Sequence, residues 1–192
     1  MRRLCDIVGF KIGSIQNRII ENIDEGSFVY TIYSQMDLHD DLIGAKISNS
    51  DHKIIHTKDQ VQTLHTGDVV FSLISGNAAI VREIHNGYLY TQNYIKLILS
   101  EKIDSRFLVY CINENTSIKR QLRVGLQGSM VFKYTLKQLK EIEMPTLPFL
   151  EKQRRIGEVY EKQLRLQALR SRVADLESMI LLHQLEEEMK NE

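Results

Sequence analysis

Amide, hydroxyl and basic side chains that can bond to nucleic acid stand in several predicted loops of this sequence. Asn and Gln can form two hydrogen bonds with adenine, Arg can do the same with guanine, and Lys and Ser can bond to phosphate. Taken together these side chains predict a DNA-contacting surface that uses some of them, although each one singly is also an ordinary polar residue of a loop. The candidates in chain order are Arg18, Asn77, Gln92, Lys119, Arg120, Arg123, Gln127, Ser129 and Lys133.

Charge is distributed unevenly along the chain, although 25 basic residues balance 25 acidic ones. The stretch from Lys119 to Lys140 contains six basic residues and no acidic one. The stretch from Glu21 to Asp41 contains six acidic residues and no basic one. Because local charge matters more to a polyanion than net charge does, the basic stretch favours a surface that faces phosphate. The alternative explanation is two solvated faces of opposite charge.

Residue patterns for catalysis are missing from the sequence. No glycine-rich loop has phosphate-binding spacing, no His-Glu-x-x-His motif occurs, and Cys5 and Cys111 are expected to be inert thiols. We expect the adjacent Asp40 and Asp41 to be solvated carboxylates of an acidic loop rather than metal ligands. No catalytic residue, metal or cofactor is therefore predicted. Two cysteines without a disulfide framework, and no apolar run of signal-peptide or membrane-spanning length, favour a cytoplasmic protein.

Up to about residue 100, the elements that must position the candidates are predicted to be mainly β-strands. Runs of β-branched and aromatic residues between turn residues predict antiparallel strands, curled or paired into a small barrel. Asn86 and Gly87 predict a type I′ hairpin turn between two of these strands. The runs lie at residues 28–33, 53–56, 69–74, 78–84 and 88–99.

After the predicted strands, the spacing of apolar residues changes to that of α-helices. Asp104 or Ser105 can cap a helix, and a second helical stretch ends near Val124. Thr135, with a glutamine three residues later, has the spacing of a capping box before a third, short helix. The two prolines of the chain then end the compact part, because proline interrupts a helix and favours an extended chain before it.

The last part of the chain, residues 148–192, predicts one long helix. Its apolar residues recur at steps of three and four, which is the spacing of the a/d seam of a coiled coil. At about 1.5 Å per residue the helix is about 60 Å long, more than a domain of this size needs. We therefore expect it to project and to pair with a second helix, the alternative being a helix folded back on the core. The expected seam residues are Val159, Leu166, Leu169, Val173, Leu176 and Ile180.

Four stretches in this order resemble the specificity subunit of type I restriction-modification systems. They are Gly-Asp-Val-Val-Phe-Ser-Leu-Ile-Ser-Gly at 67–76, Tyr-Thr-Gln-Asn at 90–93, Gly-Ser at 128–129 with the short helix after it, and the segment 142–156. The last is the most specific, because it is similar to the family's Ile-Pro-x-Pro-x-Leu-x-x-Gln-x-x-Ile motif before a conserved helix. Two details depart from that motif: the prolines are one residue further apart than usual, and Lys152 stands where glutamate is frequent.

The resemblance implies an α+β chain with a single target-recognition domain at 1–147, β-rich with short helices, and a long helix at 148–192. A usual specificity subunit has two such domains, each followed by a helix, and the two helices pair antiparallel. This sequence contains one of each, so the resemblance predicts a half-subunit that forms a homodimer and recognises a bipartite, palindromic site in double-stranded DNA. The implied partners are a second copy and the methyltransferase and nuclease subunits, which supply the chemistry; no cofactor of its own and no membrane are expected.

A different class of function stays open beside this one. The chain could be a non-catalytic interaction module, or a remnant, that pairs with a full-length specificity subunit without serving a methyltransferase directly. The zero net charge and the acidic stretch support that alternative.

Overall fold

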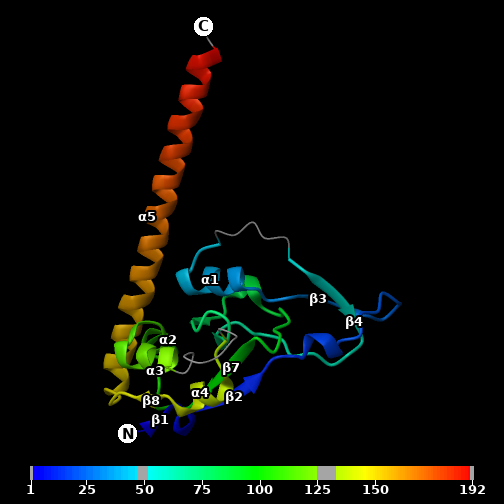
Figure 1. The fold of residues 1–192 in the computed structure, drawn as a ribbon, viewed down its shortest axis with the longest axis vertical. Helices are drawn as coiled ribbons and strands as arrows, with labels where there is room; N and C mark the ends of the chain where they lie inside the picture. The colour runs from blue at the N-terminus through cyan, green and yellow to red at the C-terminus, as the bar shows by residue number, and fades with distance from the viewer. Residues whose placement is uncertain (1, 47–51, 125–132, 191–192) are drawn as a thin grey trace.

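A mixed domain of strands and short helices carries one long helix that projects from it in the computed structural model, which describes residues 2–46, 52–124 and 133–190 (Figure 1). The predicted α+β class is therefore confirmed. The strands are β1 (Arg2–Arg3), β2 (Val8–Ile12), β3 (Phe28–Thr31), β4 (Ile54–Thr57), β5 (Val69–Ser72), β6 (Ala78–Ile80), β7 (Tyr94–Leu99) and β8 (Glu143–Met144). The α-helices are α1 (Gln35–Ile43), α2 (Ser105–Glu114), α3 (Thr116–Val124), α4 (Leu136–Glu141) and α5 (Leu150–Lys190). Short 3-10 helices are η1 (Leu4–Asp6), η2 (Gln16–Arg18) and η3 (Glu83–His85).

The main sheet is antiparallel and has the order β2-β7-β5-β6. Strand β5 lies inside it and all four of its residues are buried, as expected for the apolar run at 69–74. Strands β3 and β4 form a separate two-stranded ribbon that extends to one side of the domain (Figure 1). A third pairing, between β1 and β8, joins the start of the chain to the segment that precedes α5.

The type I′ hairpin predicted at Asn86 and Gly87 is wrong. Strand β6 is followed by η3, and β7 pairs with β5 and β2 rather than with β6. Asn86 has φ −63° and ψ 131°, and Gly87 has φ +84°, which are the angles of a type II turn. Only the glycine needs the left-handed region here, and the turn is closed by a hydrogen bond from the Tyr88 N–H to the His85 carbonyl (3.3 Å). The predicted strand at 78–84 therefore ends early, at Ile80.

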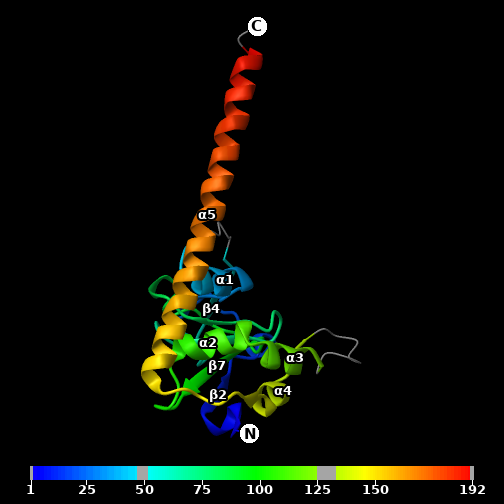
Figure 2. The same cartoon turned by 90° about the vertical axis from the view of Figure 1, so that its left-hand side faces the viewer.

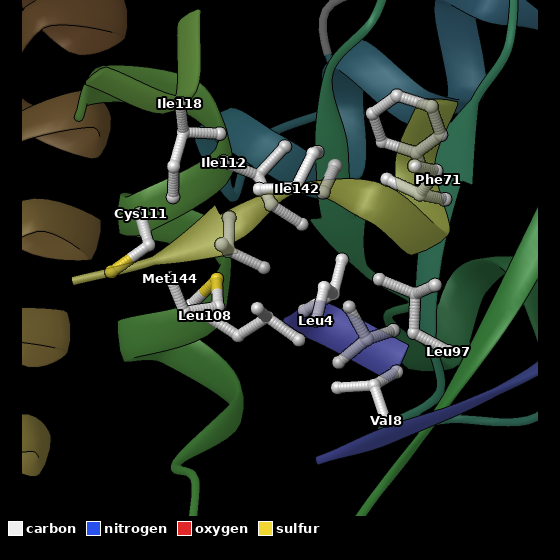
Figure 3. Packing of buried hydrophobic residues seen from close by; sticks show 14 of the residues in the cluster. Leu4, Val8, Phe71, Leu97, Leu108, Cys111, Ile112, Ile118, Ile142 and Met144 are labelled. Carbon is white, nitrogen blue, oxygen red and sulfur yellow. The ribbon is translucent and has the colours of Figure 1, made fainter. Parts of the chain in front are cut away.

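The core lies between the main sheet and helix α2 (Figure 3). Asp104 caps α2 by accepting a hydrogen bond from the Phe107 N–H (3.1 Å), as the sequence predicted. The spacing of α2 places Phe107, Leu108 and Cys111 on its buried face, against Leu4 and the strands. Burial raises the pKa of the Cys111 thiol to about 12, which agrees with the inert thiol expected there.

Helix α1 was not predicted, and it corrects the expected acidic loop. Ser34 caps it in a capping box with Asp37, and Gly44 (φ +71°) ends it. Asp40 and Asp41 are each 1% exposed, so the expectation of solvated carboxylates is wrong. They lie on the side of α1 that packs against the domain, where Asp41 bonds to Tyr33 before the helix and to Arg82 and His85 much later in the chain.

Helix α5 is 41 residues long, which corresponds to about 60 Å at about 1.5 Å per residue. Its first turns pack on α2, where Gln153 and Gly157 are buried. Beyond Ala168 every residue that the structure describes is exposed, and Figures 1 and 2 both show the helix leaving the domain. The long projecting helix is thus confirmed, and a helix folded back along its whole length is wrong. Within the described ranges no helix is long and apolar enough to cross a membrane.

Candidate nucleic-acid interface

Three of the predicted basic residues lie on helix α3. The helix turns Ile118 and Leu122 into the core, so Lys119, Arg120 and Arg123 stand on its outer side. Lys119 pairs with Glu114 of α2 across 3.3 Å. Arg120 and Arg123 are exposed and form no ion pair with any other residue of the described ranges. These two guanidinium groups are therefore available to an external anion.

Helix α3 is held in place by side-chain bonds at its start and along its length. The Asn115 Oδ1 accepts hydrogen bonds from the N–H groups of Ser117 (3.1 Å) and Ile118 (3.2 Å). The Gln121 side chain bonds to both the N–H (2.8 Å) and the carbonyl (3.1 Å) of Glu143, which joins α3 to the segment after α4. The helix that presents Arg120 and Arg123 is therefore fixed to the domain at these points.

A second group of candidates lies where β5 and β7 meet their loops. The Lys133 Nζ donates a hydrogen bond to the Oδ1 of Asn93 (2.6 Å), which is the residue after Gln92 in the chain. The Gln92 Oε1 in turn accepts the N–H of Gln16 (2.7 Å) in η2, which also carries Arg18. These bonds bring together residues 92, 133 and 18, which are far apart in the sequence. Gln92 and Lys133 are committed to bonds within the protein, whereas Arg18 is exposed.

Asn77 joins this second group through the turn between β5 and β6. The preceding Gly76 has φ +73°, and a Cβ there would overlap the ring of Tyr134. Tyr134 also donates its N–H to the Leu73 carbonyl (2.9 Å), so the turn and the segment after Lys133 lie together. Asn77 is exposed at this turn. Gly76 is thus required both by its backbone angle and by the close approach of the aromatic ring.

The remaining two candidates, Gln127 and Ser129, lie outside the described residues. They belong to residues 125–132, which connect the end of α3 to Lys133. The structure therefore divides the other predicted candidates into a helix group on α3 and a loop group around Gln92, one at each end of this segment.

A buried polar cluster escaped the sequence analysis. His85 bonds through Nδ1 to Asp41 (2.8 Å) and through Nε2 to Asp37 (3.2 Å), and it is 2% exposed. His52 also contacts Asp37 (2.8 Å), and the Tyr33 hydroxyl donates to Asp41 (2.6 Å). The Ser34-x-x-Asp37 spacing was the one local signal of this arrangement, since it is a capping box. The partners themselves come from distant parts of the chain.

Burial and hydrogen bonds within this cluster shift the pKa values of His85 and Asp37. Burial alone would lower the pKa of His85, but its hydrogen bonds to Asp37 and Asp41 outweigh burial and raise the pKa to about 9. Burial would raise the pKa of Asp37, but hydrogen bonds from His85, His52 and Ser34 hold it well below its usual range. Near neutral pH a protonated His85 therefore faces the ionised carboxylate of Asp37.

The cluster is arranged for packing rather than for reaction. Both ring nitrogens of His85 are bonded to carboxylates, and the ring is enclosed by Tyr33 and Tyr88. Among the described residues no group of three or more His, Cys, Asp and Glu side chains is arranged to hold a metal ion. The cluster joins α1 to η3 through the bonds of His85 to Asp37 and Asp41.

The predicted seam of α5 lies on its uncovered surface. All six seam residues are exposed: Leu166 is the least exposed at 43%, and Val159 is the most exposed at 69%. A second apolar patch, which the sequence analysis did not single out, consists of Leu182, Leu185 and Met189, all exposed near the tip. At ~100° per residue this tip patch lies roughly 150° around the helix from the seam. Met179 and Leu181 are exposed on the two sides between them, so near its tip the helix is apolar over more than the seam.

Comparison with known proteins identifies the family. A family model described as the type I restriction modification DNA specificity domain matches residues 1–171. The chain therefore belongs to this family of type I restriction-modification specificity proteins, as its motifs predicted. Among curated proteins no match was found.

Solved structures share the fold at low sequence identity. The HsdS subunit from Thermoanaerobacter tengcongensis matches with a TM-score of 0.57 and 19% identity, over 90% of this chain and 39% of that one. A chain from a structure on complex assembly and conformational transition of the type I R-M system gives 0.60 and 21%, over 95% and 42%. The S subunit from M. genitalium gives 0.52 and 16%, over 94% and 41%. The chain thus spans about two fifths of the length of these relatives.

Proposed function

We propose that this chain is a half-subunit that recognises DNA as a homodimer. Two copies pair through the seam of α5, and each domain binds one half of a bipartite, palindromic site in double-stranded DNA. The observation that carries the proposal is an apolar seam left uncovered on a projecting helix of a DNA specificity domain. An apolar stripe of this kind is stable in water only when a second surface covers it.

The spacing of the seam supports an antiparallel pair. In a pair centred on Val173, Leu166 faces Ile180 of the other copy, and each lies seven residues from the centre. Gly157, where each helix crosses α2 of its own domain, lies sixteen residues before Val173, so the two crossings would be about 50 Å apart at about 1.5 Å per residue. The homodimer would therefore hold its two domains at a fixed separation, which is the property that a bipartite site requires.

The helix group and the loop group supply the DNA contacts. Arg120 and Arg123, exposed and without an ion pair among the described residues, are suited to phosphate or to guanine. Arg18 and Asn77 are exposed in the loop group and are suited to base edges or phosphate. Lys119, Gln92 and Lys133 already have partners within the protein, so we assign them mainly to positioning the surface. Gln127 and Ser129 belong to the segment between the groups.

The catalytic steps of the system belong to other subunits. Methyltransferase and nuclease subunits would be recruited by the homodimer, while this chain supplies specificity and no catalysis. The tip patch of Leu182, Leu185 and Met189 faces away from the seam, so it would stay uncovered in the homodimer. That surface is suited to an apolar face of the methyltransferase subunit.

A second candidate function uses the same seam. The chain could instead pair with the helix of a full-length specificity subunit and act as an interaction module. The uncovered seam favours this candidate too, since it would fit any helix with a matching stripe.

Mapping of methylated adenine across the genome of the source strain, with and without this gene, tests both candidates. The homodimer predicts a palindromic bipartite motif with a fixed gap that loses methylation when the gene is deleted. A lost motif with two different halves would favour pairing with a full-length subunit. If deletion changes no motif, the proposed function is wrong.

A further inference from the structure

The attachment of α5 to its domain uses one face of the helix over its first turns. Gln153, Gly157 and Glu161 follow each other at intervals of four residues, so they lie along this face. Each of the three makes a different kind of contact with the domain. Together they form what we call the attachment face of α5.

Gln153 fixes the start of the helix. Its side chain is 1% exposed, and its Oε1 accepts the N–H of Asp104 (3.0 Å) at the beginning of α2. Its Nε2 donates to the carbonyls of Lys102 (3.2 Å) and Pro148 (2.8 Å). One amide thus ties the first turn of α5 to the first turn of α2 and to the chain that enters α5.

Gly157 fixes the distance between the two helices. A Cβ at this position would lie 2.5 Å from the Cβ of Arg106 and 2.7 Å from the backbone nitrogen of Phe107. The backbones of α5 and α2 are therefore in direct contact at this crossing. The crossing defines a pivot, and the angle between the helices is set by contacts further along α5, where Tyr160 packs edge-on against Tyr110 of α2 and Glu161 makes a second point of attachment.

Glu161 supplies that second point. Its Oε1 accepts from Arg82 (3.0 Å), and its Oε2 pairs with the Nε of Arg106 (2.9 Å). These two arginines come from different parts of the domain, the loop after β6 and helix α2. Charge-assisted bonds to both carboxylate oxygens constrain direction as well as distance.

Arg82 is itself anchored in the buried cluster. Its Nε donates to the Asp41 carbonyl (2.9 Å), and its N–H donates to the Asp41 Oδ1 (3.0 Å). Asp41 is bonded to His85 and Tyr33. A continuous chain of hydrogen bonds therefore leads from the core, through Arg82, to Glu161.

We propose that the bridge Arg82–Glu161–Arg106, acting with the pivot at Gly157, sets the angle at which α5 leaves the domain and thereby specifies the gap between half-sites that the homodimer accepts. This inference rests on the proposed function. A change of about 10° at the pivot would move the centre of the seam by about 4 Å at about 1.5 Å of rise per residue. Both domains of a homodimer move in this way, so they shift relative to one another across the helix axis by about 8 Å, a displacement comparable with about two base pairs at ~3.4 Å each.

The test is a series of DNA duplexes that carry the two half-sites, first identified by selection from random DNA with the wild-type chain. The gap between the half-sites is varied one base pair at a time, and affinity is measured for each duplex. The wild-type chain should show one preferred gap. Glu161→Ala should shift the preferred gap by one or more base pairs, or lower at least threefold the ratio of the affinity for the preferred gap to the affinity for the neighbouring gaps. The affinity for a single half-site should stay unchanged.

Two further variants complete the design. Glu151→Ala is the matched control, since Glu151 is exposed on the same helix and its ion pair within the described residues is with Arg155, one turn further along α5. It should leave the gap preference unchanged. Arg106→Ala removes the other half of the bridge and should change the preference in the same way as Glu161→Ala. Thermal melting and sedimentation confirm that each variant is folded and dimeric.

The outcomes separate the two proposals. A wild-type chain without any gap preference would overturn the proposed function and this inference with it. A clear wild-type preference that both Glu161→Ala and Arg106→Ala retain would leave the proposed function standing and overturn the role of the bridge.

Discussion

Pairing of α5 through its seam can be tested at Val173, which lies at the centre of the proposed antiparallel pair. There the two copies of Val173 face each other, so one substitution changes the interface twice. Val173→Ala removes two methyl groups from each copy, and the side chain of Val173 is 54% exposed in the single chain. Burial of one methyl group contributes ~0.8 kcal/mol, and about half of this is gained only when the helices pair, because Val173 is about half exposed in the single chain. For the four methyl groups of the two copies, the dimer therefore loses about 2 kcal/mol of its association free energy.

This loss corresponds to roughly a 25-fold increase in the dissociation constant of the dimer, since about 1.4 kcal/mol is tenfold. Val173→Lys should be more severe, because two ammonium groups would meet in an apolar interface. We expect that variant to be monomeric over the whole concentration range in which the wild-type chain is a dimer. Sedimentation velocity over a dilution series measures both effects.

Ala174→Lys is the matched control. It introduces the same charge at the next residue, ~100° around the helix and away from the seam. We expect it to sediment as the wild-type chain does. The reasoning is refuted if Val173→Lys remains a dimer of unchanged affinity, or if Ala174→Lys weakens the dimer as much as Val173→Lys.

Three other predictions follow from the domain. Arg123→Ala should weaken DNA binding and lower the slope of log affinity against log salt by about 0.9 if Arg123 meets one phosphate, whereas Lys152→Ala on α5 should change neither; a titration at several salt concentrations measures this. The raised pKa of His85, about 9, means that its bonds stabilise the fold fully below its ordinary value of 6.5 and that this stability is lost as the pH rises through about 9; urea unfolding from pH 6 to pH 10 should show this decline, and a flat profile would contradict it. Gln153→Leu should lower the unfolding free energy by about 2 kcal/mol or more, because it leaves one buried N–H and two carbonyl groups without their partner; urea unfolding of this variant beside Gln138→Leu, at an exposed capping box, checks the size of the effect.

The elements with a clear local pattern could be predicted from the sequence. Helix α2 has an N-terminal aspartate and apolar residues at helical spacing, and α4 has a capping box, so both were predicted. Helix α5 was predicted for the same reason, from its steps of three and four. In each case the residues that specify the element lie within a few positions of one another.

Helix α1 shows where local patterns are insufficient. Its inward side carries Asp37, Asp40 and Asp41 beside few apolar residues, so its hydropathy does not resemble that of a buried helix. Asp41 is stable there largely because His85 and Arg82 reach it from more than forty residues away in the sequence. No local rule contains that information.

In the candidate site, too, local features could be predicted from the sequence and contacts between distant segments could not. The basic side of α3 could be predicted, because a charge run beside two buried apolar residues is a local feature. The bonds of Gln92 to Gln16 and of Lys133 to Asn93 join distant segments, so the sequence could not show that these side chains are already engaged. The bridge at Glu161 depends on Arg82 and Arg106 and was missed for the same reason.

The most direct test of the account is selection of binding sites from random DNA with the purified chain, followed by native mass spectrometry of the chain on the selected duplex. The account predicts an inverted repeat with one fixed gap and two copies of the chain on each duplex. A single, unrepeated sequence bound by one copy would contradict it.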